Sequence, residues 1–232
     1  MSDKLTFLAS KKNALLLGIF AAICTALVSL TYVLTAPIIE QQEKQQTLKK
    51  INQVLVSSHF DNNPLENCVM ISAPEITGSI NITPIYRATR QNQPYALVFQ
   101  TQTKQGYNGL IKLLASVDTK GEVQGVRTLI HQETPGLGDK IELTKSDWIL
   151  GFNQQQIKDE NDKRWFVKKD GGAFDQFTGA TITPRAVVNQ LRTSIAQVNQ
   201  KFEQIFALEN QCNSNLNVIS ANNAQEANVN DN

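Results

Sequence analysis

The segment from residue 175 to residue 184 combines a threonine hydroxyl with the features of an anion site. It reads Asp-Gln-Phe-Thr-Gly-Ala-Thr-Ile-Thr-Pro and lies just ahead of a strongly patterned helix. The Gly-Ala pair leaves room beside Thr181, because glycine permits backbone angles that other residues avoid. Thr183 is expected to cap the helix, with Pro184 in its first turn. A helix N-terminus carries unsatisfied N–H groups and partial positive charge, so the Thr181 hydroxyl would lie beside a phosphate-binding position. Taken alone, the segment is more typical of an ordinary loop and N-cap.

A second constrained segment runs from residue 131 to residue 138 and reads His-Gln-Glu-Thr-Pro-Gly-Leu-Gly. It directly follows a predicted strand. Pro135 fixes one backbone angle, whereas Gly136 and Gly138 open others. Such a run is typical of a rigid turn. It is equally suited to present backbone polar groups along one edge, where they would hydrogen-bond a flat polar ring.

A membrane anchor is predicted near the N-terminus. Ala14 to Leu34 is a run of 21 residues without a charge. At about 1.5 Å per residue, a helix of this length spans roughly 30 Å, the thickness of the hydrocarbon core. The run exceeds the ~7–15 apolar residues of a cleaved signal peptide, and no clear Ala-x-Ala cleavage site follows it. An uncleaved signal-anchor is therefore expected, with Pro37 marking a helix end or a kink.

The lysines that flank the anchor indicate its orientation. Three precede it and three follow at a greater distance: Lys4, Lys11 and Lys12, then Lys44, Lys49 and Lys50. The counts are equal, so only the proximity of Lys11 and Lys12 to the anchor favours an N-terminus inside the cell.

The chain is accordingly expected to have four parts. Residues 1–13 would be cytoplasmic, residues 14–36 would form the transmembrane anchor, and residues 37–212 would form one extracytoplasmic domain. Residues 213–232 are rich in asparagine and lack aromatic or periodic apolar residues. They cannot bury enough surface to offset the entropy of ordering, so a disordered tail is predicted there.

Charge and composition give no support for nucleic-acid or metal binding. Removing the three of 22 basic residues and the one of 21 acidic residues that precede the anchor leaves 19 and 20. This near balance gives no reason to expect a nucleic-acid partner. His59 and His131 are far apart and the three cysteines have no close spacing, so no metal signature appears.

The cysteines differ in their expected surroundings. Cys24 falls inside the anchor, where it is most simply a small apolar residue. Cys68 and Cys212 would share the outer compartment, where oxidising conditions permit a disulfide. The sequence does not show that the two meet in space, so their pairing is a hypothesis that depends on the topology.

The domain is predicted to be α+β, with an antiparallel sheet backed by helices. The expected helical segments are Glu40–Val56, a turn within Ser146–Phe152, and Pro184–Leu208. The candidate strands are Ile85–Thr89, Tyr95–Thr101, Leu110–Val117, Val123–His131 and Trp165–Val167. Turns at residues 106–109 and at Gly121 link three of the strands, which favours an antiparallel meander. Apolar residues recur every three or four positions along the last helix and should pack on one face of the sheet.

The motifs resemble those of membrane-bound FMN-binding subunits. Residues 175–181 match the family's flavinylation motif, Asp-x-x-Ser/Thr-Gly-Ala-Thr, and residues 133–138 resemble its Glu-Thr-Pro-Gly-Leu-Gly loop. Residues 106–111 resemble its Gly-Tyr-x-Gly-x-Ile segment. The chain is most similar to the G-subunit family of Rnf/Rsx ion-translocating electron-transport complexes, which is related to the C subunit of Na+-translocating NADH:quinone reductase. The resemblance extends from the anchor to about Phe206.

The resemblance implies a covalent cofactor. In that family the last threonine of the motif carries FMN through a phosphoester bond, made by a flavin transferase that uses FAD. Thr181 is the matching residue here. The residues expected to shape the recognition turn around it are Asp175, Thr178, Gly179 and Ala180.

The resemblance also implies which residues contact the flavin. The loop of Glu133, Thr134, Pro135, Gly136, Leu137 and Gly138 would lie against the isoalloxazine. Glu133 and Thr134 would be its main polar contacts. Three further candidates have competing interpretations: Tyr107 is equally a hairpin aromatic, Trp148 is more typically a core side chain, and Lys140 is by default an exposed charge.

The implied function is electron transfer rather than stand-alone catalysis. The chain would be a single-pass subunit of the bacterial inner membrane with a periplasmic FMN domain. It would relay electrons among the other subunits of a complex that couples this flow to ion movement. No Gly-x-Gly-x-x-Gly run is present, so the chain itself is not expected to bind NADH. Two alternatives remain: a signal-anchored binding or assembly module without flavin, and an envelope flavin reductase.

Overall fold

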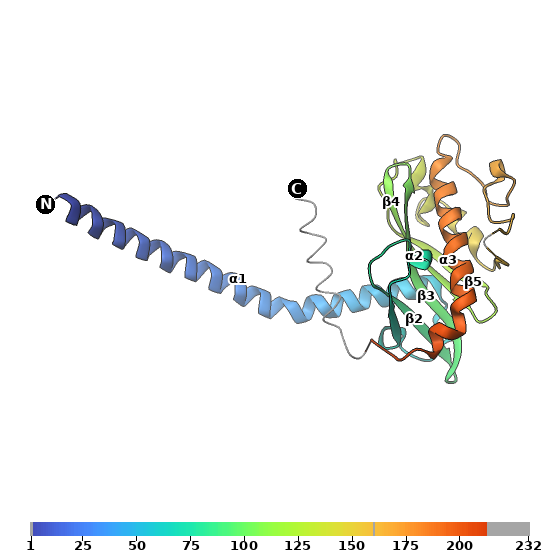
Figure 1. Cartoon of the computed structure of the whole chain (residues 1–232), viewed down its shortest axis with the longest axis horizontal. Coiled ribbons are helices and arrows are strands. Elements are labelled where there is room, and N and C mark those ends of the chain that lie inside the picture. The colour runs from blue at the N-terminus through green and yellow to red at the C-terminus, as the bar shows by residue number, and fades with distance from the viewer. Residues whose placement is uncertain (1, 160, 213–232) are drawn as a thin grey trace. The chain divides into compact units, whose positions relative to one another are not determined.

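The computed structural model describes residues 2–159 and 161–212. The chain divides into two compact units, one ending at Thr47 and the other beginning at Leu48. Helix α1 (Ser2–Val54) starts in the first unit and ends in the second (Figure 1). The segment predicted to be a disordered tail, residues 213–232, lies outside the described residues.

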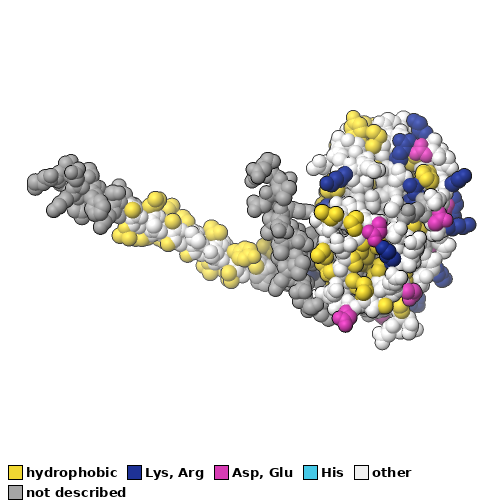
Figure 2. Space-filling model, viewed as in Figure 1, with side chains coloured by type: hydrophobic (Ala, Val, Ile, Leu, Met, Phe, Trp, Pro, Cys, Tyr) yellow, Lys and Arg dark blue, Asp and Glu magenta, His cyan; other side chains and the backbone are white. Residues whose placement is uncertain are grey.

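Helix α1 contains the predicted membrane anchor. Among the described residues it is the one helix long and apolar enough to cross a membrane, judged by length and composition. Side chains from Ala14 to Leu34 are exposed, and hydrophobic groups cover much of the face of this part of the helix that Figure 2 shows. The structure excludes a helix end at Pro37, because α1 continues through it to Val54. Proline removes one backbone hydrogen bond, and a long apolar helix tolerates that loss.

The second unit contains a five-stranded antiparallel sheet within the described residues, in the order β1-β2-β3-β4-β5. The strands are β1 (Cys68–Ile71), β2 (Thr83–Arg90), β3 (Gln93–Gly106), β4 (Gly109–Asp118) and β5 (Val123–Ile130). Each strand pairs with the next one along the chain. This arrangement confirms the predicted meander and the α+β class.

Two strand predictions differ from the structure. Strand β1 was not predicted, because its four residues are too few to show a pattern; its pairing with β2 places it at the sheet edge. Trp165–Val167 is not a strand, and Val167 forms only an isolated bridge to Phe174. The rings of Trp165 and Phe174 lie 5.3 Å apart, so tertiary packing produces a strand-like apolar pattern there without a ladder.

Helix α3 (Ile182–Ala207) covers one face of the sheet, as predicted from its apolar stripe (Figure 1). All six residues of the stripe are buried: Val187, Leu191, Ile195, Val198, Phe202 and Ile205. They pack against side chains of the central strands, including Leu97, Phe99 and Leu113. Burial of this stripe is the main apolar contribution to holding the helix on the sheet.

The C-terminal end of α1 packs in a second apolar cluster with residues of β1–β4. This cluster includes Ile51, Val54 and Leu55 together with Val98. Ser116 in β4 donates a hydrogen bond to the Val54 carbonyl. A Cβ on Gly125 would lie 2.7 Å from the backbone of Val54, so glycine allows this close approach.

Short helices connect the larger elements. They are α2 (Pro74–Thr77), η1 (Ser57–His59), η2 (Pro64–Glu66), η3 (Gly138–Ile141), η4 (Asp147–Phe152) and η5 (Lys168–Asp170). The helical turn predicted within Ser146–Phe152 is confirmed as η4. The Ser146 hydroxyl caps it by accepting from the backbone N–H of Trp148 at 3.2 Å.

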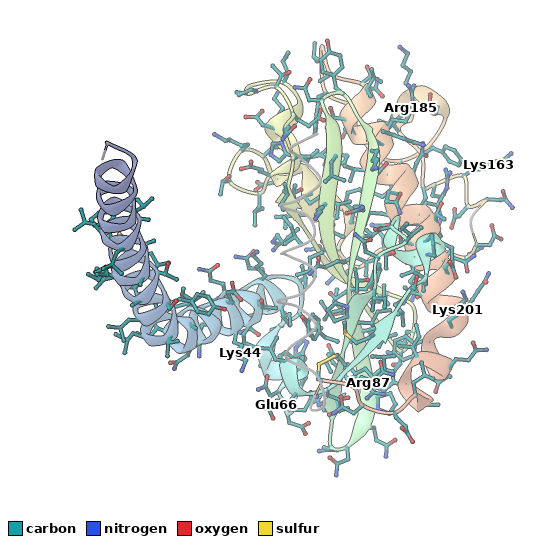
Figure 3. All side chains as sticks on the ribbon, turned by 60° about the vertical axis from the view of Figure 1, so that its left-hand side comes forward. Lys44, Glu66, Arg87, Lys163, Arg185 and Lys201 are labelled. Atoms are coloured by element: carbon teal, nitrogen blue, oxygen red, sulfur yellow. A yellow bond between two sulfur atoms is a disulfide. The ribbon has the colours of Figure 1, made fainter. Side chains whose placement is uncertain are left out.

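A disulfide holds the C-terminal end of the described chain to the sheet edge. Cys68 in β1 is bonded to Cys212, with a Cα–Cα distance of 5.2 Å, which confirms the hypothesised pair. Nearby, the buried guanidinium of Arg87 donates to the carbonyls of Phe206 at 3.0 Å and Leu208 at 2.6 Å (Figure 3). The positive charge thus satisfies carbonyls at the C-terminal end of α3.

Candidate functional site

Three segments that are distant in sequence meet at one end of the sheet. They are the β3–β4 hairpin, the loop after β5, and the first turn of α3. Asn108 of the hairpin donates from its backbone N–H to Glu133 Oε1 at 3.1 Å and from its side chain to the Gln132 carbonyl at 2.8 Å. The Thr183 hydroxyl of α3 donates to Glu133 Oε2. Glu133 therefore joins all three segments.

The Glu133 side chain is enclosed rather than open to solvent. The residue is 4% exposed, and both of its carboxylate oxygens accept hydrogen bonds from protein donors. A Cβ on Gly106 would lie 2.6 Å from Oε1, and one on Gly138 would lie 2.8 Å from Oε2. The two glycines thus allow the hairpin and the loop to close on the carboxylate. The predicted role of Glu133 as a polar contact of a flavin ring competes with these internal bonds.

The helix cap differs from the prediction. Helix α3 begins at Ile182, and Thr181 occupies the N-cap position with φ −77° and ψ −26°. The expectation that Thr183 caps the helix is wrong, because Thr183 lies inside the first turn and its hydroxyl is turned inward to Glu133. Pro184 lies in the first turn, as expected.

The Thr181 hydroxyl is uncommitted. It forms no cap hydrogen bond, and no other hydrogen bond of this hydroxyl occurs within residues 2–159 and 161–212. The turn before it needs glycine, because Gly179 adopts φ +80°. A Cβ at that position would meet Leu137 Cδ2 at 3.5 Å, which places the Leu137 side chain beside the turn. Thr181 is half-buried, and its hydroxyl is available for chemistry.

Apolar side chains of the site are unusually exposed. Tyr107 in the hairpin is 67% exposed, Leu137 in the loop 41%, and Ile182 at the start of α3 47%. Gly136 has φ +79° and open space where a Cβ would be. The three converging segments thus present bare apolar groups, which are typical of a surface that meets a ligand or a partner.

Trp148 contacts the segment that leads to Thr181. Its indole Nε1–H donates to the Asp175 carbonyl at 2.8 Å, and its ring contacts Phe152 and Phe177 edge to face, with centroids 5.3 and 5.1 Å away. The Asp175 carboxylate forms an ion pair with Lys168 Nζ at 2.6 Å. Trp148 is half-buried, so its position agrees with a core side chain at the edge of the site.

A second ion pair ties the start of α3 to η5. Arg185 donates from Nε and Nη2 to the two carboxylate oxygens of Asp170 at 2.6 and 2.9 Å (Figure 3). This bidentate hydrogen bond lowers the pKa of the Asp170 carboxyl below its usual value. The Arg185 backbone N–H donates to the Thr181 carbonyl at 3.4 Å. The pair holds the segment before Thr181 against the helix.

His131 is bonded within its own loop. Its Nε2 lies 2.6 Å from Glu142 Oε1, and its Nδ1 accepts from the backbone N–H of Glu133 at 3.0 Å. The hydrogen bond to His131 is the largest cause of the lowered pKa of Glu142. These contacts fix the entry of the chain into the 133–138 loop.

The remaining predicted site residues lie around these groups. Thr178, Pro135 and Gly136 are exposed, and Ala180, Thr134 and Lys140 are half-buried. The Lys140 side chain forms no ion pair with a described residue. Sequence reasoning missed Asn108 and Asp139. Asp139 is 7% exposed, and its Oδ1 has no hydrogen-bond partner among the described residues.

Comparisons with known proteins confirm the family resemblance. Residues 1–54 match the model of the RnfG N-terminal region, and residues 106–196 match the FMN-binding domain. The chain is 50% identical to the G subunit of the ion-translocating oxidoreductase complex of Shewanella loihica, over 81% of this chain and 89% of the relative. It is 48% identical to the protein of that name in Vibrio cholerae over 88% of this chain and 97% of the relative. The crystal structure of Shewanella oneidensis NqrC aligns with a TM-score of 0.44 and 19% identity, over 66% of this chain and 74% of that one. On these sequence identities, the chain belongs to the G-subunit family of ion-translocating oxidoreductase complexes.

Proposed function

We propose that the chain is a membrane-anchored electron carrier that holds FMN through a phosphoester bond to Thr181. The observation that carries this proposal is the uncommitted Thr181 hydroxyl at the start of α3. It lies in the segment that matches the FMN-binding domain, and the turn two residues before it, at Gly179, lies beside the exposed side chain of Leu137. The ester oxygen would be Thr181 Oγ1, and the backbone N–H groups of the first turn would face the phosphate.

The residues present fit such a cofactor. The exposed apolar groups of Tyr107, Leu137 and Ile182 offer contacts to the faces and edges of a flat ring. Asp139 directly follows the 133–138 loop, against which the family resemblance would place the flavin ring. Its Oδ1 has no hydrogen-bond partner among the described residues and could act as an acceptor. Lys140 supplies a cation without an ion-pair partner in the described chain, suited to the phosphate or a ring oxygen. Thr134 and the exposed backbone of Pro135 and Gly136 supply further polar groups.

Bound FMN would accept and donate electrons, and the protein would set its position and reduction potential. Thr181 would hold the phosphate, and the turn formed by Thr178, Gly179 and Ala180 would leave room for it. Asp175 would be read by the flavin transferase that makes the bond. No side chain of this chain is required to move a proton in such a relay.

The same proposal covers location and partners. Residues 14–36 would cross the bacterial inner membrane once, with residues 1–13 in the cytoplasm and residues 37–212 in the periplasm. The Cys68–Cys212 disulfide supports an oxidising compartment for the domain. The other subunits of the complex would supply and accept the electrons, and the complex would couple this flow to ion movement.

The test is co-expression of the chain with its flavin transferase, followed by denaturing gel fluorescence and peptide mass mapping. Wild-type protein should carry flavin on one peptide that contains residues 179–184. Thr181→Val should abolish the covalent flavin while the domain still folds. Thr178→Ala should reduce attachment only mildly, and Asp175→Ala should mainly slow it.

The two alternatives make different predictions in the same experiment. A binding or assembly module would give a colourless wild-type protein. A flavin reductase would turn over with a small-molecule acceptor as an isolated domain. Flavin mapped to Thr134 or Thr183, or no flavin at all, would overturn the proposed linkage.

A further inference from the structure

Glu133 differs from Asp170 and Asp175, two other acidic residues near the site, in having no cationic partner among the described residues. Asp175 pairs with Lys168, and Asp170 pairs with Arg185. Within the described part of the chain, the Glu133 carboxylate forms no ion pair with lysine or arginine. Its hydrogen bonds come from neutral groups, the Asn108 backbone N–H and the Thr183 hydroxyl. Both donate to the carboxylate oxygens, one to Oε1 and one to Oε2.

The surroundings of this carboxylate exclude water. Glu133 is 4% exposed, and the backbone at Gly106 and at Gly138 approaches its two carboxylate oxygens closely. A charge in such a site is screened much less than a surface charge. The first turn of α3 contributes the Thr183 donor and a partial positive charge, which stabilise the carboxylate without neutralising it.

The position of Glu133 also places its charge close to the proposed flavin. Its hydrogen-bond partner Thr183 is two residues from Thr181, and its neighbour in the loop, Leu137, lies beside Gly179. A fixed negative charge opposes the addition of electrons to a nearby ring. Its field should therefore lower the reduction potential of that ring.

We infer that Glu133 is a positioning residue that braces the hairpin, the 133–138 loop and α3, and that its buried charge lowers the reduction potential of the bound flavin. The inference rests on the proposed function. It differs from a direct polar contact with the ring, because both oxygens are already bonded within the protein.

The substitution Glu133→Gln removes the charge of the side chain and can keep its two hydrogen bonds. The amide oxygen can accept from the Asn108 N–H, and the amide NH2 can donate to the Thr183 hydroxyl, so both contacts survive in a neutral side chain. The matched control is Glu142→Gln, which removes the carboxylate that follows η3 and keeps an amide oxygen that can still accept from His131 Nε2. The Glu142 side chain is 38% exposed, and its partners are His131 and Thr144.

The experiment is a spectroelectrochemical titration of the full-length, flavin-loaded protein in detergent at pH 8. The flavin midpoint potential should rise in Glu133→Gln and remain near the wild-type value in Glu142→Gln. A purely structural role would not move the potential of protein that still folds and loads. An unchanged potential in Glu133→Gln, or an equal rise in both variants, would overturn the inference.

A second pair of variants covers the case in which Glu133→Gln does not fold. Thr183→Ser keeps the hydroxyl that donates to Glu133 Oε2, and the dipole of this hydroxyl partly screens the Glu133 charge. Thr183→Val removes the hydroxyl and with it this screening. The potential should be lower in Thr183→Val than in Thr183→Ser, and equal values would count against the inference. Wild-type protein without flavin would overturn the proposed function and this inference together, whereas loaded protein with unshifted potentials would overturn the inference alone.

Discussion

At the scale of single residues, the site is organised by where hydroxyl groups point. Thr181 and Thr183 are two positions apart, yet one hydroxyl is uncommitted and the other is buried against Glu133. The sequence identified Thr181 from its motif but assigned Thr183 to capping. That assignment failed because capping rules consider only local partners, whereas the partner of Thr183 is 50 residues away.

The first residue-scale prediction concerns Gly138. A Cβ there would lie 2.8 Å from Glu133 Oε2 and 2.9 Å from Thr183 Oγ1. Gly138→Ala should therefore destabilise the domain by about 1–3 kcal/mol, because the well-packed carboxylate has no room to move. Urea unfolding of the full chain in detergent measures this, with Gly151→Ala as the control.

Gly151 is a suitable control because a Cβ there would have nothing within 4 Å and its φ is not positive. Its substitution should leave stability unchanged or slightly improve it. Equal free energies of unfolding for the two alanine variants would contradict the crowding seen around Glu133.

At the scale of elements, the helices and strands that could be predicted are those with a long pattern of apolar residues. The four strands from β2 to β5 follow from their apolar runs and flanking turns, and helix α3 follows from its single apolar stripe. Strand β1 and the segment 165–167 could not be predicted, since each is fixed by tertiary neighbours rather than by its own sequence. The meeting of hairpin, loop and α3 likewise depends on long-range contacts to Glu133, which a single sequence does not reveal.

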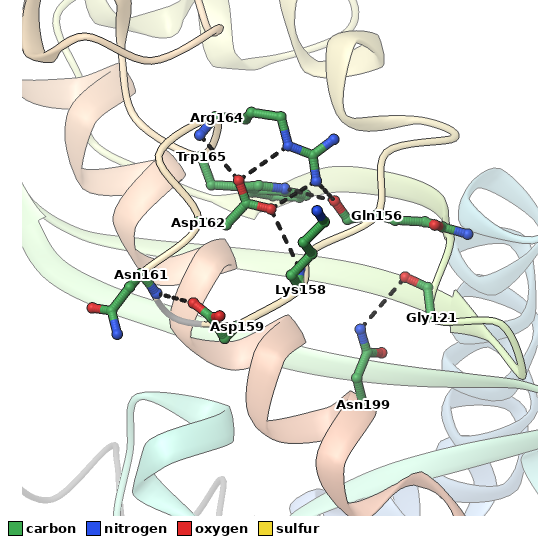
Figure 4. Close-up of polar contacts among 9 residues, drawn as sticks. All are labelled: Gly121, Gln156, Lys158, Asp159, Asn161, Asp162, Arg164, Trp165 and Asn199. Atoms are coloured by element: carbon green, nitrogen blue, oxygen red, sulfur yellow. Dashed lines mark hydrogen bonds and ion pairs between the residues drawn. The ribbon is translucent and has the colours of Figure 1, made fainter.

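The loop between η4 and η5 depends on a local charge network. Arg164 donates to both oxygens of Asp162, at 3.0 Å from Nε and 2.7 Å from Nη2, and also to the Gln156 carbonyl (Figure 4). The Trp165 Nε1–H donates to the same carbonyl at 3.2 Å. Hydrogen bonding from Arg164 lowers the pKa of Asp162 to about 2.

The second prediction is a pH dependence of stability. Because the pKa of Asp162 is lower in the folded state, the ionised carboxylate stabilises the fold above about pH 4. This contribution is lost as the pH falls from about 4 through about 2. Asp162→Asn should therefore lower the melting temperature at pH 6, and the difference from wild type should shrink toward zero near pH 2. A difference that stays constant over this range would contradict the ion-pair explanation.

At the scale of the whole molecule, the sheet edge and the C-terminal end of the described chain are joined covalently. The Cys68–Cys212 bond closes a loop with a sequence separation of 144. Asn210 reinforces the junction by donating to the Glu66 carbonyl at 2.6 Å and accepting from the Cys68 N–H at 3.1 Å. The link limits the unfolded ensemble, which is the main way a disulfide stabilises a fold in the chain-entropy model.

The third prediction is the cost of removing that link. The double substitution Cys68→Ser and Cys212→Ser should destabilise the domain by about 4 kcal/mol. Cys24→Ser should have no such effect, since Cys24 is a free cysteine in α1. Free-thiol counting on unreduced, denatured wild-type protein should find one reactive cysteine, and three would contradict the bond.

The fourth prediction tests the proposed topology of the whole chain. Lys163 is exposed on the domain, so Lys163→Cys in a Cys24→Ser background offers a single free thiol there (Figure 3). If the domain is periplasmic, a membrane-impermeant maleimide small enough to pass the outer membrane should label this cysteine on intact cells. Ser2→Cys in the same background should be labelled only after the inner membrane is lysed, because Lys11 and Lys12 favour a cytoplasmic N-terminus. The reverse labelling pattern would place the domain in the cytoplasm, where a stable Cys68–Cys212 disulfide is not expected.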